Sequence, residues 1–472
     1  MKTMRKIISI AGVLLILTGV LSSCGTKKQE VKKQEFISFT TGDEAKNKIL
    51  SDGKMKKSVS VEKGQEFILD LGEEKSFDTI LLDEIGDNVN WFKISVFDGG
   101  AWKIVYEQDR ILKHHTCYIE PTKSQKIKIE ITDCKAPVEL CEISVYSANK
   151  SEKPFKVSQY LRFDKENMTG FFKDIEGSSG YYDVVTDVII FATISMNEKA
   201  ELVFVDGEET FAKILKDFRE VLGERNPHLW GTIFLKAKDA QGNSSHDITA
   251  DFVMKNSDKI KATLKTFVEK YNLYGIDYDW EYPESKTQWK AYDKLVTETA
   301  SITKVAVALP PWGIGFSKDA IKAIEHINVM TYDLFDERFD HCNSFIGGID
   351  SIERLRKAGF NDEQILLGIP TYGRTTDKSG NAWPVYRNNP QLGKWGNKIK
   401  DFPYKDEDGN QKTCDGYLDS FAEARDKTAL SVDSGIGGVM IFRAMCDAPY
   451  TYEYSIHRAI KEVIDTRVVE KK

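Results

Sequence analysis

The chain has 472 residues, with 66 Lys and Arg against 73 Asp and Glu and a formal net charge of −7. Hydrophobic residues make up 41% and charged residues 29%, which is typical of a folded globular protein and excludes a disordered or collagenous chain. The acidic balance argues against a nucleic-acid partner, because binding nucleic acid requires a basic surface. A chain of this length is expected to form two or three domains.

The N-terminus has the features of a targeting segment. A basic head of six residues precedes an apolar stretch, 7–21, that is too short to cross a bilayer comfortably but suits a signal peptide. The stretch runs into Leu-Ser-Ser-Cys24, which resembles a bacterial lipobox, whose cysteine is lipidated; the alternative is a plain signal peptide with a chance cysteine. We therefore expect a lipoprotein signal peptide (1–23), a polar tether (24–35) and a membrane anchor on Cys24 in the bacterial cell envelope, with the outer membrane as one candidate.

Six further cysteines lie three on each side of residue 150, so they cannot all form disulfides within their own half of the chain. The sequence has no CxxC, HxH or HExxH spacing, and it gives no support for a zinc or iron site. We expect buried free thiols, no metal and no other cofactor. We also expect a monomer.

Residues 36–150 read as a β-sandwich, because short apolar alternations are separated by turn residues without helical periodicity between them. Asp98-Gly-Gly100 predicts a hairpin turn. The order LDLG, WFKISVFDGGAWK and EISVY resembles the discoidin, or coagulation-factor type C, module, which implies a possible carbohydrate-binding role; a passive spacer is an equal alternative. The expected strands are Phe67–Leu71, Thr79–Leu82, Trp91–Phe97, Trp102–Tyr106, Ile127–Ile131 and Leu140–Tyr146.

Residues 156–468 show a different pattern, in which apolar strands alternate with amphipathic helices. Eight strands, each followed by a helix, are the number expected for a (β/α)8 TIM barrel, so the fold class is α/β with an N-terminal antiparallel sandwich. In such barrels the catalytic groups lie at the C-terminal ends of the strands. The expected strands are Val157–Phe163, Asp187–Ala192, Trp230–Leu235, Gly275–Glu281, Val305–Leu309, Ile327–Tyr332, Ile365–Pro370 and Gly437–Phe442, with helices such as Thr210–Val221, Ser257–Tyr271, Asp319–Glu325 and Tyr417–Thr428.

The fourth of these strands carries three carboxylates, Asp277, Asp279 and Glu281, two residues apart. Alternate residues of a strand point to one face, so all three should face the barrel interior, with Glu281 nearest its mouth. The spacing alone is weak evidence, because a chain this rich in acids produces it by chance. Burying three ionised groups without partners is costly, however, and a purely structural strand would avoid it.

The segment Asp277-Tyr-Asp279-Trp-Glu281-Tyr-Pro resembles the fourth strand of glycoside hydrolase family 18, the chitinases and endo-β-N-acetylglucosaminidases, which carries D-x-x-D-x-D-x-E. The first acid of that motif is Tyr274 here, expected to serve packing. The family's S-x-G-G on strand three is absent, and Phe442 stands where a Trp usually forms the floor of the sugar site. Further agreements are Pro310-Pro311, Met330-Thr-Tyr332-Asp333, Pro370-Thr-Tyr372-Gly-Arg374 and Gly437-Gly-Val-Met440.

The resemblance implies a retaining glycosidase whose substrate supplies its own 2-acetamido oxygen as nucleophile. Glu281 would be the acid, Asp279 would hold the acetamido N–H, and Asp277 would share a proton with Asp279. Tyr332 would hydrogen-bond the acetamido oxygen. The residues expected to line the substrate site are Met330, Asp333, Tyr372, Arg374, Phe442 and Trp312.

Two functions remain open from the sequence. The first is an enzyme that cleaves β-1,4 bonds next to N-acetylglucosamine, in chitin-like oligosaccharides or in the chitobiose core of N-glycans. The second is a surface lectin on the same barrel, which the presence of Glu281 disfavours. The stretch between Arg374 and Gly437 leaves little room for a large α+β insertion, which predicts a shallower cleft and slightly favours branched glycans. In this stretch Trp383, Tyr386, Trp395 and Tyr404 would stack on sugars or pack the loop on itself.

Overall fold

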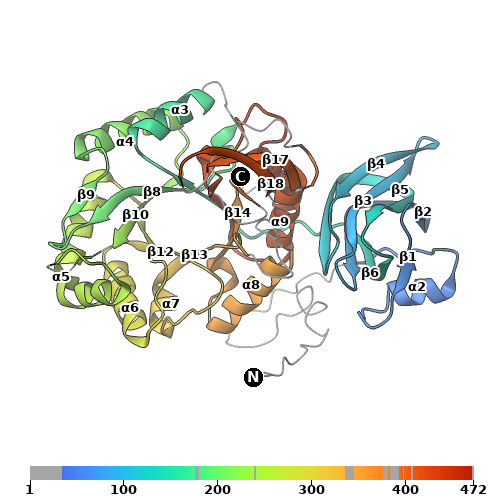
Figure 1. The fold of residues 1–472 in the computed structure, drawn as a ribbon, viewed down its shortest axis with the longest axis horizontal. Coiled ribbons are helices and arrows are strands. Elements are labelled where there is room, and N and C mark those ends of the chain that lie inside the picture. Colours follow the sequence, from blue (N-terminus) through green and yellow to red (C-terminus); the bar gives the residue numbers. More distant parts are fainter. Residues whose placement is uncertain are drawn as a thin grey trace.

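The computed structural model describes residues 35–175, 180–235, 237–238, 241–334, 345–375, 381–382, 393–396, 398–405 and 408–469. Two bodies follow each other along the chain, a β-sheet domain and a barrel of alternating strands and helices (Figure 1). The expected signal peptide, Cys24, all but the last residue of the tether, Cys342, Trp383, Tyr386 and the side chain of Tyr404 lie outside the described residues.

The sheet domain consists of six antiparallel strands in the order β1-β6-β2-β5-β3-β4. Two strands are much longer than expected, because β2 joins two of the predicted runs and β5 continues well beyond its own. The first half of β2 pairs with the second half of β5, and its second half pairs with both β5 and β6, with register shifts between. One sheet thus folds over a single apolar core. The bounds are β1 (Val59–Val61), β2 (Glu66–Glu84), β3 (Val89–Asp98), β4 (Ala101–Gln108), β5 (His115–Cys134) and β6 (Val138–Tyr146), preceded by helix α2 (Glu44–Leu50).

The second domain is the expected (β/α)8 barrel, and all eight predicted strands are present. Its parallel strands run β7-β8-β10-β11-β12-β13-β14-β19 around a closed ring, with β19 hydrogen-bonded to β7. The bounds are β7 (Lys156–Leu161), β8 (Asp187–Met196), β10 (His228–Leu235), β11 (Gly275–Asp279), β12 (Lys304–Leu309), β13 (Ile324–Val329), β14 (Ile365–Pro370) and β19 (Gly438–Phe442); the short β9 (Leu202–Phe204) pairs with β8.

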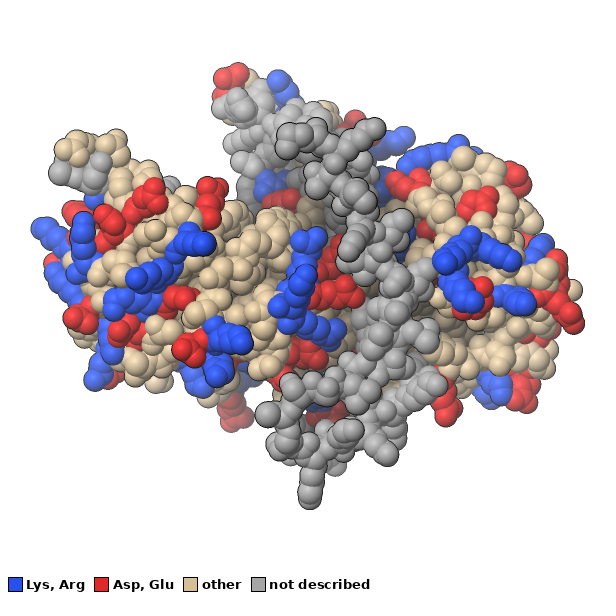
Figure 2. Space-filling view, turned by 90° about the horizontal axis from the view of Figure 1, so that it is seen from below, with Lys and Arg blue, Asp and Glu red and all other residues tan. Residues whose placement is uncertain are grey.

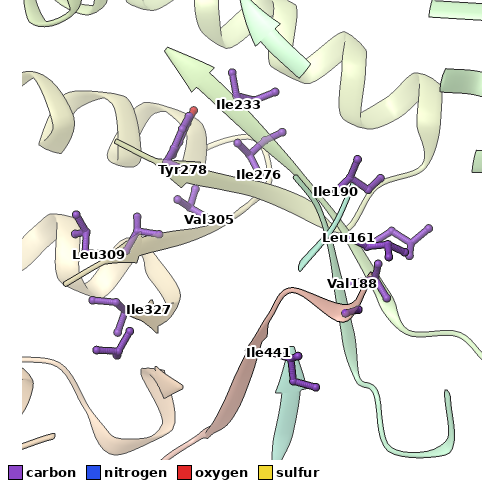
Figure 3. Packing of buried hydrophobic residues seen from close by; sticks show 14 of the residues in the cluster. Leu161, Val188, Ile190, Ile233, Ile276, Tyr278, Val305, Leu309, Ile327 and Ile441 are labelled. Carbon is purple, nitrogen blue, oxygen red and sulfur yellow. The ribbon is translucent and has the colours of Figure 1, made fainter. Parts of the chain in front are cut away.

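Each barrel strand is followed by a helix that packs its apolar side on the ring. Ile276 and Tyr278 point outwards into this layer of aliphatic and aromatic side chains (Figure 3), so Asp277 and Asp279, between and after them, point inwards. Two of the four predicted helices, 210–221 and 319–325, agree within about two residues with the structure. Helix α5 begins earlier than predicted, at His246, where Ser245 caps it. The helix predicted from Tyr417 begins only at Phe421, because Tyr417 still belongs to a strand and Ser420 caps the helix. The helices are α3 (Lys165–Ile175), α4 (Glu208–Leu222), α5 (His246–Tyr271), α6 (Lys286–Ala300), α7 (Lys318–Ala323), α8 (Phe345–Ala358), α9 (Phe421–Asp433) and α10 (Ile456–Arg467).

A small antiparallel unit is inserted between β14 and α9. Its four strands close on themselves, because each pairs with two neighbours. In the described part of the insertion, the regular secondary structure consists of strands. The strands are β15 (Gly373–Thr375), β16 (Asn381–Ala382), β17 (Lys398–Lys405) and β18 (Gln411–Tyr417).

Helix α9 lies between the barrel and the sheet domain (Figure 1), and every residue from Phe421 to Val432 is buried. From the sheet domain, the Tyr106 hydroxyl donates to Asp426 Oδ2 at 2.6 Å and the Tyr118 backbone N–H donates to Asp426 Oδ1 at 2.6 Å. On α10, Arg467 forms an ion pair with Asp78 at 3.1 Å. The sheet domain is therefore packed against one side of the barrel through specific contacts, in addition to the covalent linker.

The surface charges, the helix lengths and the cysteines can each be compared with what the sequence predicts. On the face drawn in Figure 2, acidic and basic side chains are interspersed over both domains. None of the helices in the described residues is long and apolar enough to span a membrane. The five described cysteines are free thiols, as expected, but Cys134 and Cys414 are only partly buried because they lie at the end of β5 and in the edge of the insertion.

Candidate active site

Asp277 is the innermost member of the carboxylate row and is completely buried in the barrel. Its carboxylate accepts hydrogen bonds from Thr232 at 2.8 Å, from the Tyr160 hydroxyl at 3.2 and 3.3 Å, and from Asn328 Nδ2 at 3.4 Å. Burial raises the pKa of Asp277 to about 6, and the hydrogen bonds from these three side chains oppose the rise by stabilising the charged form. The group can therefore exchange a proton near neutral pH.

Asp279 lies at the last position of β11, one step closer to the barrel mouth. Its pKa is raised well above the ordinary value by burial, by the negative charges of Glu281 and Asp277 and by a hydrogen bond with Glu281. Asp279 Oδ1 is buried and has no hydrogen-bond partner among the described residues. Such an acceptor is costly to leave unpaired, so this atom is suited to a donor brought by a ligand.

The sequence predicted that Glu281 is the last residue of the fourth strand, but in the structure it lies just beyond that strand. The ladder between β11 and β12 ends at the pair Asp279–Ala308, so the chain is released there and Glu281 is exposed at the cavity. Likewise β13 ends at Val329, so Met330 and Tyr332 follow that strand instead of belonging to it. All of these side chains nevertheless line the same cavity.

Aromatic rings form much of the cavity wall. Tyr332 stacks on Phe442 with 5.7 Å between ring centroids and 22° between planes, and Tyr160, Phe191 and Tyr372 meet the Phe442 ring edge-on at 5.1–5.9 Å. Phe442 thus occupies the central place of an aromatic cluster. Burial and the nearby Asp279 raise the pKa of Tyr332, so its hydroxyl stays protonated and can donate a hydrogen bond.

One rim of the cavity is held by an ion pair. Arg374, on β15, donates from Nε and Nη2 to the two oxygens of Asp333, each at 2.8 Å, and the Tyr372 hydroxyl donates to Asp333 Oδ2 at 2.7 Å. The Arg374 guanidinium also lies 5.0 Å above the Tyr372 ring. This two-point geometry fixes all three side chains relative to each other.

The cavity at the C-terminal ends of the barrel strands has a volume of about 630 Å³, within the range of small-ligand sites. It brings together Asp279, Glu281, Met330, Tyr332, Asp333, Tyr372, Arg374, Phe442 and the half-exposed Trp312, all of which were predicted for the site; Asp277 lies beneath it. Among the described residues, no group of three or more His, Cys, Asp or Glu side chains is arranged so that it could hold a metal ion.

Several site residues were not found by sequence reasoning. Tyr160, Thr232 and Asn328 come from three different strands and meet only when the barrel closes around Asp277. Arg162 and Arg443 add cations to the cavity wall. The one available signal was position: within the predicted first strand, Val157–Phe163, Arg162 follows Tyr160 at a spacing of two, which indicates the same face. In the structure β7 ends at Leu161, and Arg162 lies just beyond it.

Comparison with known proteins decides the family. The model of "Glycosyl hydrolases family 18" matches residues 185–447, which is more than half of the chain and includes the carboxylate row. The chain belongs to glycosyl hydrolase family 18. Within this family 18 chain, the match begins near β8 and ends just after β19, so it covers most of the barrel and leaves out the sheet domain.

Several proteins that are named as chitinases are similar to this chain, at low sequence identity. The chain is 28% identical over 137 residues to "Probable chitinase 2" of Drosophila melanogaster, covering 24% of this chain and 28% of the fly protein. It is 22% identical over 229 residues to "Endochitinase 1" of Metarhizium anisopliae, covering 39% of this chain and 54% of that protein. The chain thus spans about half or less of these curated relatives. A solved chitinase from Bacteroides thetaiotaomicron shares the fold, with a TM-score of 0.50, 14% identity, and coverage of 66% of this chain and 97% of that one.

Proposed function

We propose that this chain is a glycosidase that hydrolyses β-1,4 bonds next to N-acetylglucosamine with retention of configuration. The observation that carries the proposal is the buried, unpartnered Asp279 Oδ1, which lies between Asp277 and the exposed Glu281 at the floor of an aromatic-lined cavity. An acetamido N–H is a donor that this acceptor lacks. A neutral sugar ring matches the aromatic wall, because its apolar face packs on aromatic surface.

Glu281 is the proton donor to the leaving oxygen in this proposal. Its carboxyl group is exposed to the cavity, where a glycosidic oxygen can reach it, and the same group then activates the incoming water. Asp279, partly buried beside it, orients the acetamido group and offsets positive charge on the oxazolinium ion. Asp277 sits behind, where its pKa of about 6 lets it take part in moving a proton along the row.

Tyr332 completes the substrate-assisted step. Its hydroxyl stays protonated, and its ring is held between Phe442 and Tyr372 with little room to rotate. A rigidly held donor to the acetamido oxygen keeps that oxygen in line for attack, and such positioning accounts for a large part of a rate enhancement.

The nucleophile can be tested directly. A substrate with a free 2-amino group at the cleavage site should be inert, and a stable thiazoline should inhibit competitively. Asp279→Asn should cut the rate strongly, because an amide cannot supply negative charge opposite a cation. The contrary result can be detected by intact-mass analysis after incubation with a fluorinated slow substrate. A covalent sugar on Asp279 would show that the nucleophile is a protein side chain and would contradict the proposal.

The substrate class is tested by product masses. The protein is incubated in parallel with chitooligosaccharides and with a high-mannose glycoprotein, and cleavage within the chitobiose core or within the oligomer identifies the class. The short stretch between Arg374 and Gly437 favours the glycoprotein slightly, because it leaves little room for a large domain that would wall the cleft. Binding of both without cleavage of either would identify a lectin on the same barrel.

For the location, we propose a lipid anchor on Cys24, which makes the protein a lipoprotein of the bacterial cell envelope. Cys24→Ala should move it from the membrane fraction to the soluble fraction, since the lipid would be its anchor. Retention of a correctly processed variant in the membrane fraction would contradict the proposal.

A further inference from the structure

The insertion between β14 and α9 contacts both the cavity and the sheet domain. At one end, β15 carries Arg374, which holds Asp333 on the cavity rim. At the other end, Lys394–Gly396 lie against the sheet domain and α9. Trp395, one of the four aromatic residues expected to stack on sugars or to pack the loop on itself, lies in this segment.

Trp395 packs on the sheet domain. Its ring meets Tyr106, on β4, edge-on with 5.5 Å between centroids, and the Arg425 guanidinium of α9 lies 5.8 Å from it. The neighbouring Gly396 lies against the Trp91 ring of β3, so closely that an added Cβ would be 3.0 Å from it. Aromatic packing and a glycine-dependent close approach are features of a fitted contact and not of chance proximity.

Polar contacts hold the same segment. The Ala422 backbone N–H, at the start of α9, donates to the Lys394 carbonyl at 2.9 Å. The Lys394 ammonium lies 3.7 Å from Glu120 of β5 and 4.9 Å from the Trp395 ring. The segment is therefore attached to the barrel helix and to the sheet domain at once.

Two strand pairings lead from this contact to the cavity. β17 begins at Lys398, two residues after Gly396, and Lys398 pairs with Tyr417 of β18. Tyr417 in turn pairs with Arg374 of β15. Because β15 and β16 contain only three and two residues, few hydrogen bonds hold β15 in place, and contacts outside the unit should add to its stability.

We propose that the sheet domain positions the cavity rim. Its contacts with Trp395 and Gly396 fix the insertion, and the insertion in turn fixes Arg374 and Asp333. Trp395 is then a positioning residue, and the N-terminal domain is part of the catalytic unit. The kinetic side of this inference rests on the proposed glycosidase function. Its structural side does not, because the contacts exist without a substrate.

The test compares two sides of one contact with a control elsewhere in the same interface. Trp395→Ala removes the ring on the insertion, and Trp91→Ala removes the ring of the sheet domain that Gly396 lies against, which is not among the residues lining the cavity. Thr466→Val is the control, because it removes the hydrogen bond of 2.9 Å between Tyr118 and α10 and leaves the insertion untouched. Trp395→Phe keeps an aromatic ring at this position and should therefore behave much like the wild type in both measurements.

The first measurement is hydrogen–deuterium exchange, which needs no substrate. Both alanine variants should increase exchange in Gly373–Thr375 and Gln411–Tyr417 relative to the wild type, and Thr466→Val should not. Unchanged exchange in these strands in both alanine variants would overturn the proposal whether or not the enzyme assignment holds. The tryptophan variants report from separate domains, so failure of one to fold leaves the other decisive.

The second measurement is kcat and KM on a chitooligosaccharide or glycopeptide that the wild type cleaves. Both alanine variants should lower kcat/KM by at least about tenfold, since a displacement of 1 Å at a substrate-positioning group can cost about a hundredfold. Thr466→Val should remain within about twofold of wild type. Increased exchange with unchanged kinetics would show that the contact is structural only. A wild type that cleaves no such substrate would contradict the proposed function and leave the exchange result standing.

Discussion

Asp277 in the barrel and Asp426 at the domain interface are alike in most local respects. Both are completely buried, both accept a hydrogen bond from a tyrosine hydroxyl, and burial raises both pKa values, to about 6 and about 7. They differ in what lies next to them. Asp277 is followed along the chain by Asp279 and Glu281, which line the cavity, whereas Asp426 is enclosed by α9, Tyr106 and Tyr118. A raised pKa thus reports burial, and access to a cavity is what makes a carboxylate a candidate for chemistry.

The largest expected effect tests the cavity side of this comparison. Glu281→Gln should lower kcat by about 10²–10⁴-fold, because glutamine nearly matches glutamate in shape but cannot donate the proton. Circular dichroism and glycan binding should remain close to wild type. Asp426→Asn serves as the matched control and should keep its turnover. Retention of more than a tenth of wild-type turnover by Glu281→Gln would contradict its role as the acid.

The interface side is tested by Asp426→Ala. This change leaves the Tyr106 hydroxyl and the Tyr118 N–H buried without their acceptor, which should lower the free energy of unfolding by about 2–5 kcal/mol. Chemical denaturation measures the loss, and kcat at 25 °C should change little by comparison with Glu281→Gln. A variant as stable as wild type would mean that water replaces the lost acceptor and that the interface is not sealed.

The pH dependence sharpens the comparison further. The folded protein raises the pKa of Asp426 from near 3.8 to about 7, mainly by burial and against the opposing effect of Arg425 and Arg467. The folded state therefore binds the proton more tightly than the unfolded chain, so stability present below about pH 4 is lost as pH rises towards 7. In Asp426→Asn the group stays neutral, so Tm should fall less between pH 5 and pH 8 than in wild type. Glu142, whose pKa is also raised to about 7, contributes equally to both proteins. Parallel Tm curves for the two proteins would be the contrary result.

The smallest expected effect concerns the aromatic wall. Phe442→Leu keeps an apolar side chain but removes the ring that Tyr332 stacks on, an interaction worth about 0.5–1.5 kcal/mol. KM for a chitooligosaccharide should rise several-fold, with a smaller change in kcat and in Tm. A change in kcat as large as that of Glu281→Gln would show that Phe442 positions the reacting groups and does more than line the site.

Much of this fold could be predicted from local patterns in the sequence. Eight apolar runs predicted the barrel strands because each is buried on both faces, and the spacing of Asp277, Asp279 and Glu281 predicted a shared face because side chains alternate along a strand. The sheet domain was predicted less well. Its strands β2 and β5 continue through polar residues such as Lys75 and Ser124, which break the apolar alternation but pair with each other between the two strands. Pairing with a neighbouring strand, and not the side-chain pattern, extends them there.

Helix α9 shows where local pattern fails. Glu423, Arg425, Asp426 and Lys427 are typical of a solvated helix face, yet all four are buried. Two of these residues have partners distant in the sequence: Arg425 pairs with Glu462 at 3.1 Å, and Asp426 accepts from the Tyr106 hydroxyl at 2.6 Å. Lys427 pairs with the nearby Asp419, just before the helix, at 2.5 Å. Charges can be buried when they are paired in this way, and the pairing is invisible until the sheet domain and α10 close over the helix.

The sequence by itself determined the barrel, the order of its elements and the row of carboxylates, because each depends on the period of one segment. Tertiary structure alone decided which groups surround Asp277, where Glu281 leaves the strand, and that Trp395 joins the insertion to the sheet domain. These features bring together residues tens to hundreds of positions apart, such as Tyr106 and Trp395. The free energy of such contacts comes from packing between elements, and the period of a single segment holds no information about it.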